Sequence, residues 1–144
     1  DAPGAPLRLA PGRRERRFGA FEGRRFADIA AELPQDAERW RRRDPQWVPP
    51  GGGESLLQFQ ERATQAVCAL AAENIGKHVA MFTHGGVLDV LYRAATGLGL
   101  QDARSWQLDN AAVNRLLWTP DGGLTLVGWA DRSHLDDTRD ERFA

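Results

Sequence analysis

Four consecutive residues, Thr83-His84-Gly85-Gly86, have the composition of an anion-binding segment. Glycines let backbone N–H groups approach a phosphoryl oxygen closely, and a neighbouring histidine can donate a further hydrogen bond. If a helix begins at these glycines, its unpaired N–H groups and its dipole favour negative charge at the same place. A histidine that only caps this helix, or that binds a loop carbonyl, is the alternative, and the local pattern leaves both interpretations open.

A second group of residues places a carboxylate beside guanidinium groups. Glu15 precedes Arg16 and Arg17, and two aromatic residues and two glycines follow within residues 18–23. Arginines bind phosphate or carboxylate through paired hydrogen bonds, and a glutamate held against a substrate can act as a general acid. A surface ion-pair cluster, which contributes little to stability, is the alternative interpretation.

The elements around His84 are those that would position such a site. The continuous apolar run Val79–Phe82 predicts a short strand buried on both faces, as in a parallel sheet. An amphipathic helix is expected over about 87–96, with Gly85–Val87 at its beginning. In an open α/β sheet, ligands bind beyond the carboxyl ends of the strands, and His84 is expected at such an end.

The remaining pattern completes an α/β arrangement in one domain, residues 1–144. Helical spacing predicts helices over 24–33 and about 36–43, and a third that begins at Ser55, where Ser55 and Gln58 have the spacing of a capping box. Strands over 113–118 and 124–129, joined by a turn at Asp121-Gly122-Gly123, predict a hairpin at the edge of the sheet. The charged tail after Asp136 is expected to fray.

Composition restricts the classes of partner. The formal net charge is −1, which argues against nucleic acid and membrane surfaces as partners. Residues 1–50 contain 11 arginines and 8 acidic residues; such basic runs attract anions, but Arg41–Arg43 is interpreted as a solvated face. The single cysteine, Cys68, fits a reducing compartment, and no apolar run approaches the roughly 20 residues of a membrane span. We therefore expect a cytoplasmic protein.

Taken together, the order of the motifs resembles that of the histidine phosphatase superfamily, the phosphoglycerate-mutase-like proteins. The resemblance extends from about Leu7 to Leu135, and each motif is weak by itself. The matching segments are Glu15–Gly23, Gly53-Glu54-Ser55 with Arg62 seven residues after Ser55, Thr83–Gly86, Asn114, and Asp131–Leu135.

This resemblance implies a three-layer α/β fold with a mixed, mostly parallel sheet and helices on both faces, incomplete at its N-terminus. It implies that Glu15 is the general acid and His84 the second histidine of the active site. Arg16, Gly85 and Gly86 are expected to bind the phosphate or the rest of the substrate. It also implies a phosphatase that acts on a small phosphorylated metabolite through a phosphohistidine intermediate, without a metal or an organic cofactor.

One departure from the family pattern concerns the nucleophile. The family's nucleophilic histidine lies in an N-terminal Arg-His-Gly motif, whereas the histidines here, His78, His84 and His134, all lie in other contexts. We therefore expect that the N-terminal segment is absent and that the fragment itself is inactive. We also expect its open sheet edge to pair with a severed front portion or with a second copy in a homodimer. A phosphoglycerate mutase and a non-catalytic phosphate-binding module remain as alternatives. The short stretch between Gly23 and Gly53, and the Gly-Gly pair after His84, favour the hydrolase.

Overall fold

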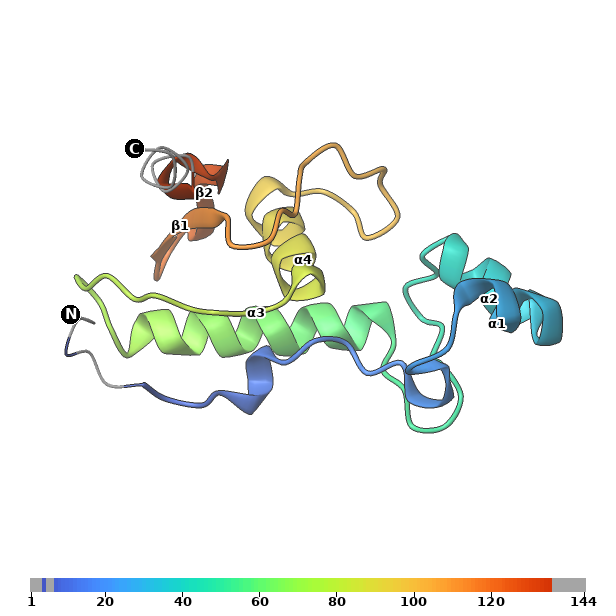
Figure 1. Ribbon diagram of the computed structural model, residues 1–144. Coiled ribbons are helices and arrows are strands. Elements are labelled where there is room, and N and C mark those ends of the chain that lie inside the picture. Colours follow the sequence, from blue (N-terminus) through green and yellow to red (C-terminus); the bar gives the residue numbers. More distant parts are fainter. Residues whose placement is uncertain (1–3, 5–6, 136–144) are drawn as a thin grey trace, which may run out of the picture.

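Helices make up most of the regular structure (Figure 1). The computed structural model describes residue 4 and residues 7–135, so the tail after Asp136 lies outside the described residues. No helix in this part of the chain combines the length and apolar character needed to cross a membrane. In chain order the elements are the 3₁₀ turns η1 (Pro11–Arg13) and η2 (Gly19–Phe21), the helices α1 (Phe26–Glu32), α2 (Pro34–Arg41), α3 (Leu56–Ala72) and α4 (Gly85–Thr96), and the strands β1 (Val113–Thr119) and β2 (Gly123–Asp131).

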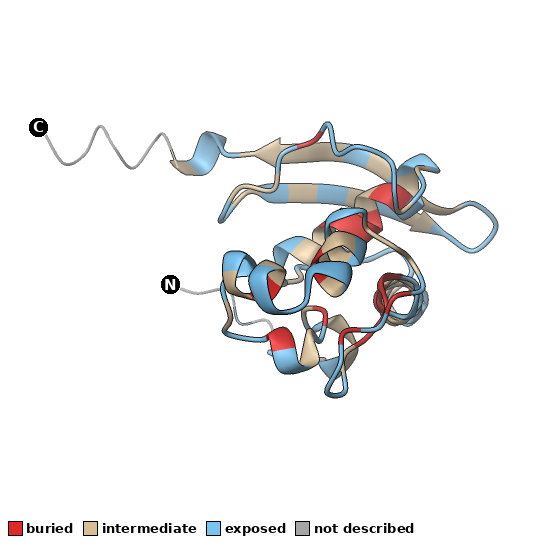
Figure 2. Ribbon diagram, turned by 90° about the vertical axis from the view of Figure 1, so that its right-hand side faces the viewer, coloured by how far each residue is buried: buried red, intermediate tan, exposed pale blue. Residues whose placement is uncertain are grey.

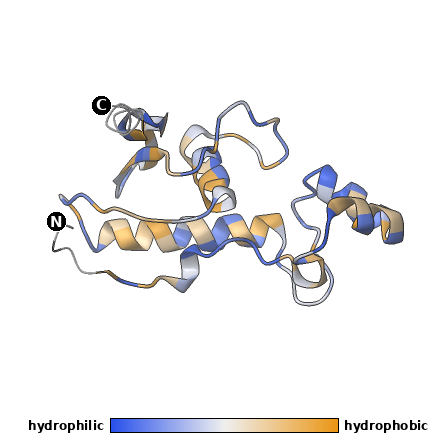
Figure 3. Cartoon of the chain, viewed as in Figure 1, coloured by the Kyte–Doolittle hydropathy of each residue, from blue (hydrophilic) through white to orange (hydrophobic). Residues whose placement is uncertain are grey.

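The main core lies between α3 and α4, which both carry hydrophobic residues (Figure 3) and buried positions, drawn red in Figure 2. The predicted capping box is confirmed: Ser55 Oγ accepts from the Gln58 N–H at 3.1 Å, and Gln58 Oε1 accepts from the Ser55 N–H at 2.9 Å. α4 ends at Gly97, whose φ of 71° is left-handed and therefore suits glycine. The buried members of this core are Leu56, Phe59 and Ala63 from α3 and Val87, Val90 and Leu91 from α4.

A second, smaller core holds α1 and α2 together, and Figure 1 shows these two helices apart from α3 and α4. Pro34 separates them because it ends α1 and occupies the first position of α2, where its missing N–H costs nothing. The buried residues are Phe21, Ile29, Ala37 and Trp47, with Trp40 packed against them. Both helices were predicted from the sequence, with boundaries that differ by a few residues.

The predicted hairpin is confirmed, but the larger sheet is not. β1 and β2 pair antiparallel and β2 lies against α4. Leu116 and Leu124 pack on the α3–α4 core, and Tyr92 of α4 stacks on Trp106 with ring centroids 4.1 Å apart. Among the described residues this hairpin forms a two-stranded sheet by itself. The expected three-layer arrangement around a mostly parallel sheet is therefore not what the described residues form.

The prediction of a buried strand over Val79–Phe82 is wrong. The segment connects α3 to α4 without regular secondary structure, and no described strand lies beside it to complete a hydrogen-bonded ladder. Phe82 is 92% exposed and Val79 46% exposed, while Met81 packs against the α3–α4 core. An apolar run predicts burial only where a neighbouring strand and a covering layer exist to bury it.

Candidate active site

Glu15 reaches the first turn of α4 from a loop that is remote in sequence. Its carboxylate Oε2 accepts a hydrogen bond from the Gly86 N–H at 2.9 Å, and its Oε1 accepts one from the Arg16 N–H at 2.9 Å. Gly86 is two residues beyond His84, so the structure brings the predicted acid into the neighbourhood of the predicted histidine. The Glu15 carboxylate therefore occupies one of the N–H groups at the N-terminus of α4 that have no partner within the helix.

Gly86 is needed for this approach because no side chain fits there. A Cβ atom on Gly86 would overlap Glu15 Oε1 and lie 2.8 Å from the carboxyl carbon. A Cβ on Gly85, by contrast, would meet nothing within 4 Å. The two glycines that the sequence presents as a pair therefore have different roles: Gly86 admits the carboxylate, and Gly85 leaves the helix N-terminus open.

His84 occupies the N-cap position of α4 in extended backbone, with φ −108° and ψ 161°. Its carbonyl accepts from the Leu88 N–H at 3.1 Å, but its side chain makes no capping hydrogen bond. The imidazole is exposed, and His84 is not among the residues that line the hollow beside Gly85 and Gly86. The alternative of a capping side chain is thus not what the structure shows, and a role on the phosphoryl group stays a prediction.

Arg16 is buried rather than free at the surface. Its Nε donates to the Glu54 carbonyl at 2.9 Å and its Nη2 to the Trp47 carbonyl at 3.4 Å, while its guanidinium lies 5.1 Å from the centre of the Phe18 ring. Burial lowers the pKa of Arg16 to about 10, although the Glu54 charge opposes that effect, so the side chain is still charged at neutral pH. These bonds attach the Glu15 loop to residues 47–54; substrate binding by Arg16 stays a prediction.

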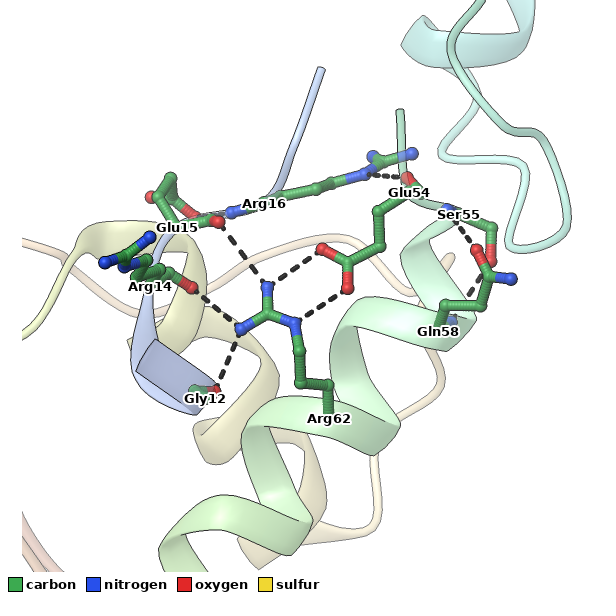
Figure 4. A network of polar contacts seen from close by, with 8 residues as sticks. All are labelled: Gly12, Arg14, Glu15, Arg16, Glu54, Ser55, Gln58 and Arg62. Carbon is green, nitrogen blue, oxygen red and sulfur yellow. Dashed lines mark hydrogen bonds and ion pairs between the residues drawn. The ribbon is translucent and has the colours of Figure 1, made fainter. Parts of the chain in front are cut away.

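Arg62 fixes the same loop to α3, as Figure 4 shows. It forms a bidentate ion pair with the buried Glu54, in which Nε donates to Oε1 at 2.7 Å and Nη2 donates to Oε2 at 2.8 Å. The remaining guanidinium hydrogens are donated to the carbonyls of Gly12 at 2.9 Å, Arg14 at 3.2 Å and Glu15 at 3.5 Å. One side chain therefore holds both the acid-bearing loop and the start of α3.

The charges of this pair stabilise each other. Burial by itself would raise the pKa of Glu54, but the hydrogen bonds and the charge of Arg62 outweigh it and hold that pKa below its ordinary value. The hydrogen bonds to Glu54 raise the pKa of Arg62 in turn, against the effect of its own burial. The sequence places Glu54 and Arg62 in a family motif, but only the structure shows that they position Glu15.

A hollow of about 380 Å³ lies beside Glu15, Gly85 and Gly86. Arg43, Asp89 and Arg104 also line it, and none of them was among the predicted site residues. A partial indication was available from the sequence, because Asp89 and Arg93 are spaced to face each other on a helix. Arg43 corrects the interpretation of Arg41–Arg43 as a solvated face, because its side chain is paired with the buried Asp89 at 2.7 Å.

Comparison with known proteins identifies the family. The family model of the histidine phosphatase superfamily (branch 1) matches residues 1–132. The chain belongs to the histidine phosphatase superfamily. It is 31% identical over 125 residues to a metal-independent phosphoserine phosphatase of Arabidopsis thaliana, over 87% of this chain and 50% of that one. It is 29% identical over 126 residues to phosphoglycerate mutase-like protein 4 of the same plant, over 87% of this chain and 53% of that one.

A solved structure has a similar fold. Bacillus stearothermophilus YhfR superposes with a TM-score of 0.73 at 24% identity, and the match covers 86% of this chain and 61% of that one. The present chain spans about half the length of the two plant relatives. The match to the family model confirms, at the level of the superfamily, the resemblance that the motifs predicted.

Proposed function

We propose that this chain forms the part of a histidine phosphatase site that binds the phosphoryl group and protonates the leaving oxygen, in a protein that hydrolyses a small phosphate monoester. The observation that supports it is the contact between the Glu15 carboxylate and the Gly86 N–H, next to His84 at the N-terminus of α4. A helix N-terminus favours a phosphoryl group, and an adjacent carboxyl group can supply a proton.

In this proposal an incoming phosphoryl oxygen replaces Glu15 at the Gly86 N–H, and His84 donates a hydrogen bond to a second oxygen. The displaced carboxylate takes up a proton from solvent and then lies beside the ester oxygen, to which it gives that proton as the phosphorus–oxygen bond breaks. The phosphoryl group is transferred to a histidine of the family's Arg-His-Gly motif, and water releases it as inorganic phosphate. No metal or organic cofactor takes part, and the single cysteine fits a cytoplasmic location.

Phosphoglycerate mutase is the second candidate, because three of the relatives carry names that include phosphoglycerate mutase. The two activities are separated by the products formed from 3-phosphoglycerate. A phosphatase releases inorganic phosphate, whereas a mutase returns 2-phosphoglycerate. A non-catalytic phosphate-binding module would bind phosphate and form neither product.

Phosphate binding can be measured on the 144-residue chain. In a titration with inorganic phosphate followed by NMR, the amide signals of Gly85 and Gly86 should shift, while that of Gly97 at the other end of α4 should not. Gly86→Ala should weaken binding about tenfold or more because the added methyl group would fill the space beside the Gly86 N–H that the Glu15 carboxylate now occupies and the phosphoryl oxygen would enter, and Gly85→Ala is the matched control with open space around its methyl group. Equal binding by both variants, or no shift at either glycine, would refute the proposed site.

The acid role is measured by turnover of the whole protein. Glu15→Gln should lower turnover of alkyl phosphates by about 10²–10⁴-fold, the usual contribution of a general acid. The loss should be smaller for aryl phosphates, whose leaving groups need less protonation. An equal loss for both classes would contradict proton donation by Glu15.

A further inference from the structure

The loop that follows α4 forms part of the surroundings of the proposed phosphate site. Residues 97–112, the α4–β1 loop, connect α4 to β1, and Figure 1 shows them projecting from α4 on the side of α1 and α2. Loops of this length without secondary structure, longer than about 12–15 residues, are usually functional in a compact domain. We infer that Arg93 is a positioning residue of the proposed active site, because it fixes this loop on α4. The inference rests on the proposed function, since it concerns what holds the surroundings of the same site in place.

Arg93 reaches the loop from the last turns of α4 and is completely buried. Its Nη1 donates to the carbonyl of Gly99 and, at 3.0 Å, to that of Asp102. Its guanidinium carbon lies 4.7 Å from the centre of the Trp106 ring. One side chain therefore holds the loop at three places, whereas most of the other loop residues are exposed.

The end of α4 does not itself need the Arg93 side chain. Gly97 has a left-handed φ of 71°, and the N–H groups of Gly97 and Leu98 both donate to the Arg93 carbonyl. This backbone arrangement ends helices without help from a side chain. Burial of a guanidinium group is costly, and replacing a buried ion pair by apolar residues is often neutral or stabilising. The buried charge is thus accounted for by the loop carbonyls that it holds rather than by the stability of the helix.

Asp89 joins Arg93 to the segment that follows α2. Its Oδ2 accepts from Arg93 Nε at 3.1 Å and from Arg43 Nη2 at 2.7 Å. Arg43 Nε in turn donates to the carbonyl of Leu100, in the same loop, at 2.7 Å. Asp89 follows Gly86 by three residues, nearly one turn of α4. The two guanidinium groups on this carboxylate therefore fix the loop relative to the N–H group proposed to bind phosphate.

A displaced loop should affect a phosphate ester more than phosphate itself. The groups proposed to bind the phosphoryl oxygens, the N–H groups of Gly85 and Gly86, belong to the first turn of α4 and not to the loop. The organic part of an ester extends from the phosphoryl group into the hollow, which Leu108 of the loop lines. Loss of the Arg93 contacts should therefore weaken the binding of an ester and leave that of inorganic phosphate as it is.

Inorganic phosphate and phenyl phosphate are each titrated into the 144-residue chain, and the amide NMR signals of Gly85 and Gly86 report binding. In Arg93→Met the dissociation constant of phenyl phosphate should rise about 3–10-fold and that of phosphate by less than about twofold, a usual size for a change that does not touch the ligand. Asp89 keeps Arg43 as its partner in this variant. Arg93→Lys keeps the charge and can still bind a loop carbonyl, so its ratio of the two constants should lie between those of wild type and Arg93→Met.

Asp102→Ala disturbs the same loop from its exposed side, without a change in the core. Asp102 Oδ2 accepts from the Gly99 N–H at 2.6 Å, which closes the turn that presents both carbonyls to Arg93. This variant should raise the dissociation constant of phenyl phosphate in the same direction as Arg93→Met. Asp121→Ala makes the same substitution at an exposed turn aspartate of the hairpin and should change neither constant.

The outcomes separate the two proposals. If the affinities for phosphate and phenyl phosphate change in parallel in Arg93→Met, or if neither changes, the positioning role is refuted and the proposed function stands. If Arg93→Met does not fold, Asp102→Ala decides, and an unchanged ratio in that variant refutes the role of the loop contacts. If neither ligand shifts the signals of Gly85 and Gly86 in the wild-type chain, the proposed function is refuted and the positioning role with it.

Discussion

Replacing Arg62 by glutamine tests whether the Glu54 pair positions the proposed active site. The change removes both hydrogen bonds of the ion pair with Glu54, which measure 2.7 and 2.8 Å. It also removes the hydrogen bonds from Arg62 to three carbonyls of residues 12–15. Glu54, which is 3% exposed, would then be a buried carboxylate without its cation. The loop that bears Glu15 would lose its attachment to α3.

The expected loss of stability follows from these exposures. Removing one partner of a fully buried ion pair costs about 3–5 kcal/mol. The side chain of Arg62 is 28% exposed, and water can reach the freed carbonyls, so we expect a smaller loss of about 2–4 kcal/mol. For a chain of 144 residues this corresponds to a decrease in Tm of roughly 6–15 °C.

Urea unfolding followed by tryptophan fluorescence measures this difference, and its pH dependence provides a second check. In the wild-type chain the pKa of Glu54 is depressed, so its contribution to stability is present above its ordinary value of 4.5 and is lost as the pH falls through the folded-state pKa. In Arg62→Gln the unpaired carboxylate destabilises the fold at neutral pH and is neutralised in acid. The difference between the two proteins should therefore be largest near neutral pH and shrink below about pH 4.

Two further variants define the outcome. Arg62→Lys keeps the charge but cannot form the bidentate pair, so its free energy of unfolding should lie between those of wild type and Arg62→Gln. Arg25→Gln breaks an ion pair in which Arg25 is 86% exposed and should have no measurable effect. If Arg62→Gln changes stability as little as Arg25→Gln, or if its effect does not depend on pH, the Glu54–Arg62 pair does not have the role assigned to it.

Two other predictions concern the folding of the elements around the site. Ser55→Ala should destabilise the chain by about 1 kcal/mol through loss of the capping box, whereas Ser105→Ala, at an exposed serine, should not; equal urea midpoints would contradict the capping role. Phe59→Ala should cost about 3–5 kcal/mol because Phe59 is 1% exposed, whereas Phe82→Ser should change stability by less than about 0.5 kcal/mol because Phe82 is 92% exposed. A large loss in Phe82→Ser would show that the 79–82 segment is buried after all.

The elements that the sequence predicted correctly are those specified by local interactions. The capping residues Ser55 and Gln58 lie three positions apart, Pro34 restricts its own backbone, and the hairpin turn lies between its two strands. The family could likewise be inferred from the order of short motifs along the chain. Each of these features depends on residues close together in sequence, so the sequence alone determines them.

The features that the sequence did not predict depend on contacts between residues far apart in the chain. The bond from Gly86 to Glu15 joins residues 71 positions apart, and the bonds from Arg62 to Gly12 and Arg14 span 50 and 48 positions. Val79–Phe82 has the composition of a buried strand, yet it has no regular secondary structure, because a strand requires a partner and no strand among the described residues lies beside it. The buried Asp89 accepts a hydrogen bond from Arg43, 46 residues earlier. The order of the motifs predicted the family, and the hydrophobic pattern predicted most of the elements. The positions of the charged side chains, by contrast, depend on packing between distant segments.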